Sequence, residues 1–344
     1  MRIEKFTNLY RDVTKEGTKI PQEKYCLTGQ FPIVDQGQRV IAGWWNDDAG
    51  IFKNVPAIIF GDHTRAIKYM EQPFFIGADG VKILRPTNIK DNPKYLYYAL
   101  QAAKIPNLGY SRHFKVVKEL QICIYSRDEQ NEIVRVLEKI DYLIEQRHAE
   151  TTYLDQLVKS RFIELFGEPE LNPRDLPVLP WGAVFQTTTG KLDSNAMVEN
   201  GRYPFFTCAK ESYKIDSYAF DCEALLLAGN NAAGIYDVKH YKGKFNAYQR
   251  TYVLRLMNEK WSYILFKRQL EDKLRYLQSQ SKGTNTRYLT LGILNELRFV
   301  VPPIAEQEQF AAFVEQTDKS KLAVQKGLQE LEILKKTLMQ QYFG

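Results

Sequence analysis

Two separate stretches of the chain share one pattern of apolar and polar positions. The first, "ELQICIYSRDEQNEIVRVLEKID", starts at Glu119, and the second, "ELRFVVPPIAEQEQFAAFVEQTD", starts at Glu296, so position n of the first matches n + 177 in the second. This register continues without a gap to the phrases "LVKSRFIELFG" (157–167) and "LKKTLMQQYFG" (334–344). Such self-similarity indicates an internal duplication.

Each copy predicts a short buried strand followed by a long helix. The apolar runs "LQICIY" and "LRFVVPP" are typical of strands. Ser126 and Glu129 can form a capping box, while Pro302 and Pro303 mark the start of the second helix. Apolar residues then recur at steps of three and four, which predicts a helix of about 37 residues, roughly 55 Å long. These residues are Ile133, Leu137, Ile140, Ile144, Leu154 and Leu157 in the first copy, and Phe310, Val314, Val324, Leu328 and Leu331 in the second.

The stripes on these helices are narrow. Two matched helices of this kind favour packing on each other, as in a coiled coil, over packing of each helix on its own domain. Four polar residues interrupt the stripes, so that either a third partner covers these places or the pairing is weak there: Arg147, Thr151, Thr317 and Lys321.

The segments before the two helices correspond more loosely. "FPIVDQG" (31–37) resembles "YPFFTCA" (203–209), and "PAIIFGDH" (56–63) resembles "ALLLAGNN" (224–231). Each module therefore predicts short strands and turns, then a tyrosine-rich helix, then the strand and the long helix. The strand and loop segments of the two modules, which we call the heads, differ in sequence, whereas the helices are similar. This pattern suggests that the two modules recognise two different targets with the same geometry, because recognition residues usually lie on loops that a rigid scaffold holds in place.

Composition narrows the class of protein. A chain of 344 residues suggests about two domains, and 44% hydrophobic with 26% charged residues is typical of globular proteins. No apolar run approaches the ~20 residues that span a bilayer, and the first residues lack a signal core. We therefore expect a soluble, cytoplasmic protein with no membrane association. The net charge of +6 and the pI of 8.9 are compatible with nucleic-acid binding.

Signals for catalysis and for metal binding are weak. "TTTGKL" (187–192) has Leu192 where a phosphate loop needs Ser or Thr. "DNPKY" (91–95) lacks the second proline of a methyltransferase tetrapeptide, and no glycine-rich cofactor loop precedes it. The four histidines and four cysteines lack metal-ligand spacing, and the cysteines suit reduced, buried thiols. We expect no catalytic residue, no cofactor and no metal.

Two kinds of position are candidates for nucleic-acid contact. In both modules an apolar strand ends in glycine and two polar residues, at 61–63 and 229–231, although an ordinary turn has the same composition. Basic loops ("GYSRHFK", "SKGTNTRYL") precede the long helices, although a solvated surface would also be basic. The candidates are Asp62, His63, Arg112, His113, Lys115, Asn230, Asn231, Lys282, Asn285 and Arg287, with Arg65, Lys68, Lys210 and Arg250 as weaker ones.

Three features together resemble the specificity subunit of a type I restriction–modification system, over nearly the whole chain. They are "FGDHTRAIKYMEQPFFIGADGVKIL" (60–84), "GKFNAYQRTYVL" (243–254) and the paired Glu-Gln helices that end in Phe-Gly. The first module departs from the family because it opens without a counterpart of Trp181.

The resemblance implies an α+β protein in which two α/β target-recognition domains alternate with two helical repeats. The recognition domains would span 1–118 and 171–295, and the repeats 119–170 and 296–344. The repeats would pair as an antiparallel coiled coil and relate the recognition domains by a pseudo-twofold axis, as an internal repeat folding twice.

The implied function is non-catalytic recognition of a split, asymmetric target in double-stranded DNA, within a phage-defence system that restricts or methylates DNA. Two DNA methyltransferase subunits would dock on the helices, and translocase–nuclease (restriction) subunits would join through the complex. We expect the apolar positions left over from helix pairing to be exposed and to hold the methyltransferase: Phe162, Phe166, Leu338 and Phe343.

Two other functions stay open on the sequence alone. One is a fused or stand-alone DNA methyltransferase or nuclease, against which the missing cofactor and catalytic motifs argue. The other is a coiled-coil interaction scaffold unrelated to DNA, against which the duplicated, divergent heads and the basic pI argue.

Overall fold

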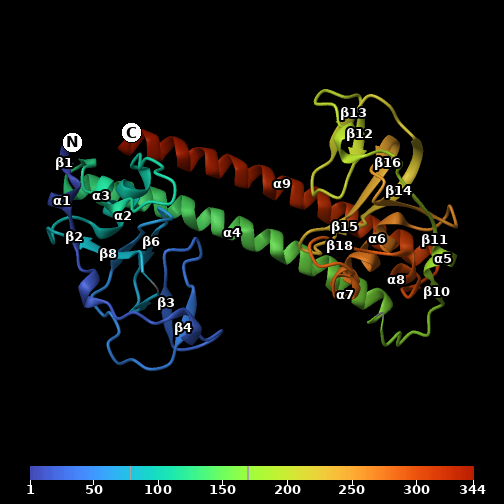
Figure 1. Cartoon of the computed structure of the whole chain (residues 1–344), viewed down its shortest axis with the longest axis horizontal. Helices are drawn as coiled ribbons and strands as arrows, with labels where there is room; N and C mark the ends of the chain where they lie inside the picture. Colours follow the sequence, from blue (N-terminus) through green and yellow to red (C-terminus); the bar gives the residue numbers. More distant parts are fainter. Residues whose placement is uncertain (78, 169) are drawn as a thin grey trace. The chain divides into compact units, whose positions relative to one another are not determined.

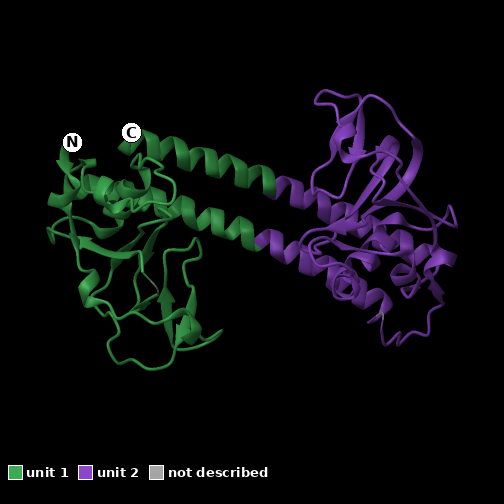
Figure 2. Cartoon of the chain, viewed as in Figure 1, with its two compact units in different colours: residues 1–149, 325–344 green, residues 150–324 purple. Residues whose placement is uncertain are grey.

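The chain forms two compact units. The computed structural model describes residues 1–77, 79–168 and 170–344, and the units are residues 1–149 with 325–344 (unit 1) and residues 150–324 (unit 2), coloured separately in Figure 2. Each unit joins a mixed α/β head to one part of each long helix, α4 (Arg127–Phe166) and α9 (Ile304–Phe343), drawn green and red in Figure 1. The mixed α/β architecture is confirmed, and each helix has 40 residues rather than about 37.

Both long helices begin as the sequence predicts. The Glu129 carboxylate accepts a hydrogen bond from the Ser126 N–H at 2.9 Å, and Ser126 Oγ accepts one from the Glu129 N–H at 3.4 Å. These two bonds are the reciprocal pair of a capping box. Helix α9 starts directly after Pro302 and Pro303, where the missing proline N–H groups cost nothing.

The head of unit 1 contains two small sheets. One has the order β2-β8-β5-β6 with antiparallel neighbours, and the other has the order β4-β3-β7 with β3 and β7 parallel. Strand β1 pairs with β9 just before α4. The elements are β1 (Arg2–Lys5), α1 (Phe6–Leu9), β2 (Tyr10–Asp12), 3-10 turns at Thr14–Glu16 and Gln22–Lys24, β3 (Phe31–Val34), β4 (Gly43–Trp45), β5 (Ala57–Gly61), β6 (Ile67–Met70), β7 (Phe75–Ile76), β8 (Val81–Pro86), α2 (Pro93–Ala102), α3 (Phe114–Val117) and β9 (Gln121–Ile124).

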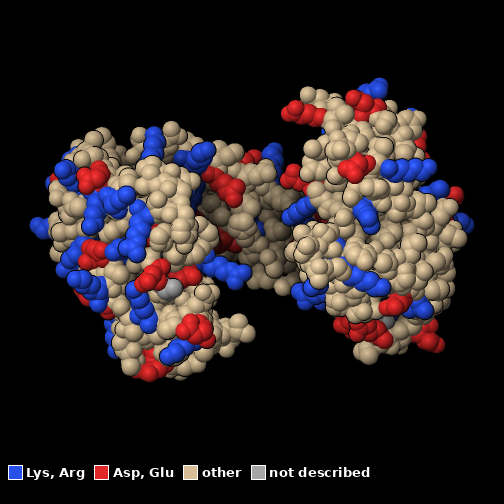
Figure 3. Space-filling view, in the orientation of Figure 1, with Lys and Arg blue, Asp and Glu red and all other residues tan. Residues whose placement is uncertain are grey.

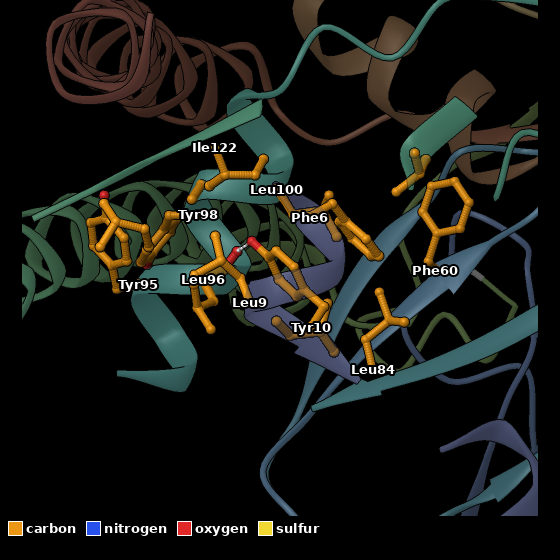
Figure 4. Packing of buried hydrophobic residues seen from close by; sticks show 14 of the residues in the cluster. Phe6, Leu9, Tyr10, Phe60, Leu84, Tyr95, Leu96, Tyr98, Leu100 and Ile122 are labelled. Atoms are coloured by element: carbon orange, nitrogen blue, oxygen red, sulfur yellow. Dashed lines mark hydrogen bonds between the residues drawn. The ribbon is translucent and has the colours of Figure 1, made fainter. Parts of the chain in front are cut away.

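The main core of unit 1 lies where helix α2 meets the four-stranded sheet and the start of α4. Helix α2 has proline at its first position and Asn92 as its N-cap, the residue types that favour a helix start. Its buried face packs with residues of α1 and β5 in one cluster, shown in Figure 4. The buried Tyr10 hydroxyl donates to Leu96 O at 2.8 Å, so its polar atom is satisfied inside this core.

The head of unit 2 follows the element order of unit 1, with β15, α7 and β18 added and with a different sheet. Strand β16 pairs with both β14 and β12, which gives a single sheet of order β11-β17-β14-β16-β12-β13. In unit 1 the equivalent strand is divided into β6 and β7 by a segment that contains Pro73, which cannot donate to a ladder. The elements are β10 (Val178–Pro180), α5 (Trp181–Val184), β11 (Phe185–Thr189), a 3-10 turn at Ser194–Ala196, β12 (Tyr203–Phe206), β13 (Tyr213–Ile215), β14 (Phe220–Ala228), β15 (Asn230–Asn231), β16 (Val238–Ala247), β17 (Thr251–Leu256), α6 (Tyr263–Asp272), α7 (Leu274–Gln280), β18 (Arg287–Tyr288), α8 (Leu291–Asn295) and β19 (Arg298–Val300).

Phe6 occupies in unit 1 the place that Trp181 occupies in unit 2. Each aromatic side chain is buried and begins a one-turn helix, α1 or α5. The Phe6 N–H donates to Leu120 O at 2.9 Å, and the Trp181 N–H donates to Leu297 O at 3.2 Å. Leu120 and Leu297 are equivalent positions of the internal repeat. The first head therefore opens like the second, with phenylalanine in place of tryptophan.

The long helices contact each other within each unit. In unit 2, Phe166 of α4 meets Phe310 of α9, and Asp155 pairs with Lys321 at 2.7 Å, so the two segments run antiparallel. In unit 1, Asp141 pairs with Lys335 at 2.5 Å. The charged Lys321 that interrupts the predicted stripe is thus held by a carboxylate of the facing helix.

The expectation that Phe162 and Phe166 are exposed is wrong. Both side chains are buried in a cluster with Val158, Leu265 and Phe310, because helix α6 of the head covers this face of α4. Leu338 and Phe343 are half-buried against the core of unit 1, and Phe343 lies 5.3 Å from the Tyr95 ring, between ring centres.

Candidate nucleic-acid interface

The two groups of candidate residues, far apart in the sequence, lie together in each head. In unit 1 the His113 N–H donates to Asp62 O at 2.9 Å, which joins the loop after β5 to the segment before α3. In unit 2 the Leu289 N–H donates to Gly229 O at 2.8 Å, and β15 pairs with β18. Each head therefore presents one composite surface, which we call the paired loops: residues 61–65 with 108–115 in unit 1, and 229–235 with 282–289 in unit 2.

Two unit 1 candidates are buried and serve to join the paired loops. Asp62 and His113 are nearly inaccessible, and the Asp62 carboxylate accepts from the Phe114 N–H at 2.7 Å. His113 Nε2 accepts from the Leu108 N–H at 3.1 Å, so its Nδ1 carries the proton and donates to Asp62 O at 2.9 Å. Their polar atoms are used within the chain, which places them as supports for neighbouring residues.

Other residues of the unit 1 loops are accessible, and one of them, Tyr110, contacts His63. The His63 ring stacks on Tyr110, with ring centres 5.2 Å apart and planes 19° apart, and Tyr110 is 94% exposed. His63 Nδ1 is buried and has no hydrogen-bond partner among the described residues. Arg112 and Lys115 are exposed on the same segment, whereas Arg65 donates to Ile105 O at 3.2 Å and is half-buried.

Gln36 links three loops at this surface, although the sequence did not indicate it as a candidate. Its Oε1 accepts from the His63 N–H at 3.2 Å, its Nε2 donates to Asp79 O at 3.3 Å, and its carbonyl accepts from the Thr64 hydroxyl. Tyr110, beside Arg112, was missed as well. The only sequence signal for Gln36 is its place two residues after a buried strand, which many turn residues share.

The unit 2 loops present different side chains on the same framework. The Asn231 side chain accepts from the N–H groups of Ala233 and Ile235 at 2.8 and 3.3 Å, so it shapes the turn. Arg287 is half-buried and donates to Gln278 O at 3.3 Å. Lys282 and Asn285 are exposed, and Asn230 is half-buried.

Both heads require glycine where the paired loops begin. A side chain at Gly61 would collide with Thr64 Oγ1, and one at Gly229 would collide with Arg250 O. The backbone of Arg250 therefore packs directly under the unit 2 loop, while its side chain is exposed, as is Lys210.

A lysine anchors the loop after β3 or β12 in each head. Lys68 Nζ donates to Asp35 O at 2.7 Å, and Lys239 Nζ donates to Ala209 O at 2.8 Å. Lys68 is buried, so its ammonium cannot face DNA as the sequence suggested. Burial lowers the pKa of Lys68, and the Asp35 carboxylate opposes this shift.

Several exposed cations on the two heads are available for an anionic partner. Arg112, Lys115, Lys210 and Lys282 form no ion pair with any described residue. On the visible face, Lys and Arg side chains occur on both heads among acidic ones (Figure 3). Exposed cations that lack carboxylate partners are typical of surfaces that contact phosphates.

The described residues offer little for other chemistry. None of their His, Cys, Asp and Glu side chains form a group of three or more that could hold a metal ion. No helix of the described chain is long and apolar enough to cross a bilayer. The four cysteines are unpaired and half-buried, rather than fully buried as expected.

Comparison with known proteins assigns the family. The model of the "type I restriction modification DNA specificity domain" matches twice, at residues 10–153 and 176–333, which together are most of the chain. The chain belongs to this specificity-domain family. The two matches coincide with the two modules of the internal repeat.

A curated relative agrees with this assignment. The type I restriction enzyme EcoDI specificity subunit of Escherichia coli is 37% identical over 139 residues, which is 40% of this chain and 30% of that protein. The match thus spans less than a third of that relative.

Two solved structures share the fold. The S subunit of the type I restriction–modification system from M. genitalium aligns with a TM-score of 0.66 at 17% identity, over 100% of this chain and 96% of that one. A chain from a structure on complex assembly and conformational transition of the type I R-M system aligns with a TM-score of 0.53 at 15% identity, over 99% of this chain and 97% of that one.

Proposed function

We propose that this chain is the non-catalytic DNA-specificity subunit of a type I restriction–modification system. The observation that carries the proposal is that both heads build the same paired loops from different side chains, His63 with Tyr110 in one and Asn231 with Arg287 in the other. One framework with two sets of side chains suits a split, asymmetric target in double-stranded DNA, because side chains at groove edges read bases.

The proposed division of the chain follows the repeat. Residues 1–118 and 171–295 are the target-recognition domains, and 119–170 and 296–344 are the helical repeats. We propose that α4 and α9 pair as an antiparallel coiled coil and that the recognition domains are related by a pseudo-twofold axis. The ion pairs Asp141–Lys335 and Asp155–Lys321 support this, because they are separated by two heptads along each helix.

The proposed DNA contacts are the accessible members of the paired loops and their neighbours. Asp62 and His113 act as supports because they are buried. The contact set is His63, Arg65, Arg112, Lys115, Lys210, Asn230, Asn231, Arg250, Lys282, Asn285 and Arg287, to which the structure adds Tyr110.

The proposed partners are two DNA methyltransferase subunits and, through the complex, translocase–nuclease subunits. Leu157 of α4 and Leu334 of α9 are equivalent positions of the internal repeat and are both exposed, so the two repeats present matching apolar side chains. Such exposed apolar residues on helices are typical of protein interfaces. The exposed apolar residues that replace Phe162 and Phe166 in this role are Tyr142, Leu143, Ile333 and Leu334 in unit 1, and Tyr153, Leu157 and Leu322 in unit 2.

Exchange of one recognition domain tests the proposed function directly. We expect that replacing residues 171–295 with the domain of another family member changes one half of the DNA target and leaves the other half as it was. Methylome mapping of cells that carry the chimera with the methyltransferase subunit measures both halves. A change in both halves would contradict the idea that each recognition domain reads one half independently. Methylation without any sequence dependence would contradict the proposed function.

Arg287→Ala is expected to weaken DNA binding. If Arg287 contacts a phosphate, the loss is similar for all sequences and the slope of log K against log salt falls by about one; if it reads guanine, discrimination falls by ~1–3 kcal/mol. Fluorescence anisotropy with cognate and scrambled duplexes over a salt series distinguishes these results. Arg275→Ala, at an exposed arginine of α7 in the same unit, is the matched control. Equal affinities of Arg287→Ala and Arg275→Ala at low salt would remove Arg287 from the interface.

A further inference from the structure

Two glutamines at equivalent positions of the internal repeat are buried in the first turn of the long helices. Gln130 of α4 is 1% exposed and Gln307 of α9 is 0% exposed. A glutamine in a first helical turn ordinarily faces solvent, and burying its amide without hydrogen-bond partners costs free energy. Both side chains therefore need partners, and in both units they find corresponding ones.

In unit 1 the Gln130 amide joins α4 to the head. Its Oε1 accepts from the Asn92 N–H at 2.8 Å. Its Nε2 donates to Tyr125 O at 3.0 Å and to Asp91 Oδ1 at 3.1 Å. Asn92 is the N-cap of α2, so one amide connects the start of the long helix to the start of the head helix.

In unit 2 the Gln307 amide makes the corresponding bonds. Its Oε1 accepts from the Ser262 N–H at 3.0 Å, and its Nε2 donates to Pro302 O at 2.8 Å. Ser262 is the N-cap of α6. The acceptor carbonyls belong to Tyr125 and Pro302, which again occupy equivalent positions of the repeat.

The head helices lead from these amides to the paired loops. In unit 1, α2 packs in one cluster with Ile58 and Phe60 of β5, the strand that ends at Gly61. In unit 2, the Tyr263 hydroxyl of α6 donates to Glu223 O of β14, the strand that ends just before Gly229. A rotation of the head helix on the long helix would therefore carry the paired loops with it.

We propose that Gln130 and Gln307 are positioning residues that fix the angle of each head on its long helix, and thereby the number of base pairs between the two half-targets. This inference rests on the proposed function. Only a side chain that donates and accepts at once satisfies both partners, which neither methionine nor an ionised glutamate can do. The amides act on spacer length and not on the identity of the bases, because they lie away from the paired loops.

The test measures spacer preference with the full chain. Gln130→Met and Gln307→Met keep the side-chain length and remove the hydrogen bonds, while Gln146→Met and Gln325→Met alter exposed glutamines on the same helices. Each variant is titrated against duplexes that hold both half-targets at spacers one base pair shorter, native and one longer. We expect the preference for the native spacer to fall about tenfold in the two buried variants, the size of effect that loss of a buried hydrogen bond has. The preference of the two buried variants for each half-target is expected to stay unchanged. The two control variants are expected to keep the spacer preference of the unaltered chain.

A second measurement does not depend on DNA. Spin labels at Leu27 in the unit 1 head and Tyr142 on α4, both exposed, report the head-to-helix distance in a chain whose four native cysteines are replaced by serine. We expect a broader distance distribution with Gln130→Met, or with Gln130→Glu if the methionine variant does not fold. An unchanged distribution, or an equal loss of affinity at all three spacers, would overturn the positioning role and leave the proposed function intact. Loss of all sequence preference in the unaltered chain would instead overturn the proposed function.

Discussion

Phe166→Asp is expected to unfold unit 2. The side chain is 2% exposed, and its ring centre lies 5.0 Å from that of Phe162 and 5.7 Å from that of Phe310. Removing a buried aromatic ring costs about 3–5 kcal/mol. A buried carboxylate without a partner adds a further penalty of several kcal/mol, and together these approach the ~5–15 kcal/mol that stabilises a typical domain. Urea unfolding followed by circular dichroism measures the loss.

Leu157→Asp is the matched control on the same helix. Leu157 is 49% exposed, so a charge there stays in water and the stability should change by less than about 0.5 kcal/mol. The control carries a second readout, because co-purification with the methyltransferase subunit reports on the proposed partner surface. If Phe166→Asp instead folds with unchanged stability and only loses the methyltransferase, then Phe166 is a contact residue, as the helical pattern alone indicated.

Deleting one heptad from each long helix is expected to shorten the gap between the two half-targets. The segments 147–153 and 324–330 both lie between the ion pairs Asp141–Lys335 and Asp155–Lys321. Removal of one heptad from both helices preserves the register of a coiled coil. The heads should then approach by up to ~10 Å at 1.5 Å per residue. The gap should shrink by up to about three base pairs at 3.4 Å each, with both half-targets unchanged.

Methylome mapping of cells that carry the doubly shortened chain measures this gap. Deletion of 147–153 alone is the control, because it leaves the facing helix one heptad longer and should destroy both the pairing and the methylation. An unchanged gap in the double deletion would show that the long helices do not set the distance between the half-targets.

The elements that are specified locally were predictable from the sequence. Helix period and the Ser126–Glu129 capping box depend on residues a few positions apart, and the gapless repeat carries the helix prediction from the first copy to the second. The opening of the first head was harder to recognise. Phe6 and Trp181 begin equivalent one-turn helices but are different residue types. The hydrogen bonds that show their equivalence join their N–H groups to leucine carbonyls far along the chain.

The candidate site was predictable as a location and less so as a set of contacts. Sequence places polar residues after β5 and before α3. It does not show that His113 donates to the Asp62 carbonyl while the Asp62 carboxylate accepts from the Phe114 N–H, so that both side chains become inaccessible. In the same way, helical periodicity defines the apolar face that carries Phe166, but it does not show which element packs on that face. Here the cover is α6, whose contribution depends on the tertiary fold.

The discontinuity of unit 1 has a consequence for biosynthesis. Unit 2 is one continuous segment, residues 150–324, whereas unit 1 needs residues 325–344 in addition to residues 1–149. At about 5–20 residues per second, the ribosome takes roughly 9–35 s to make unit 2. For that time the apolar side chains at the start of α4 lack the cover that Leu338 and Phe343 provide. The unit that is translated first is thus the last to be completed.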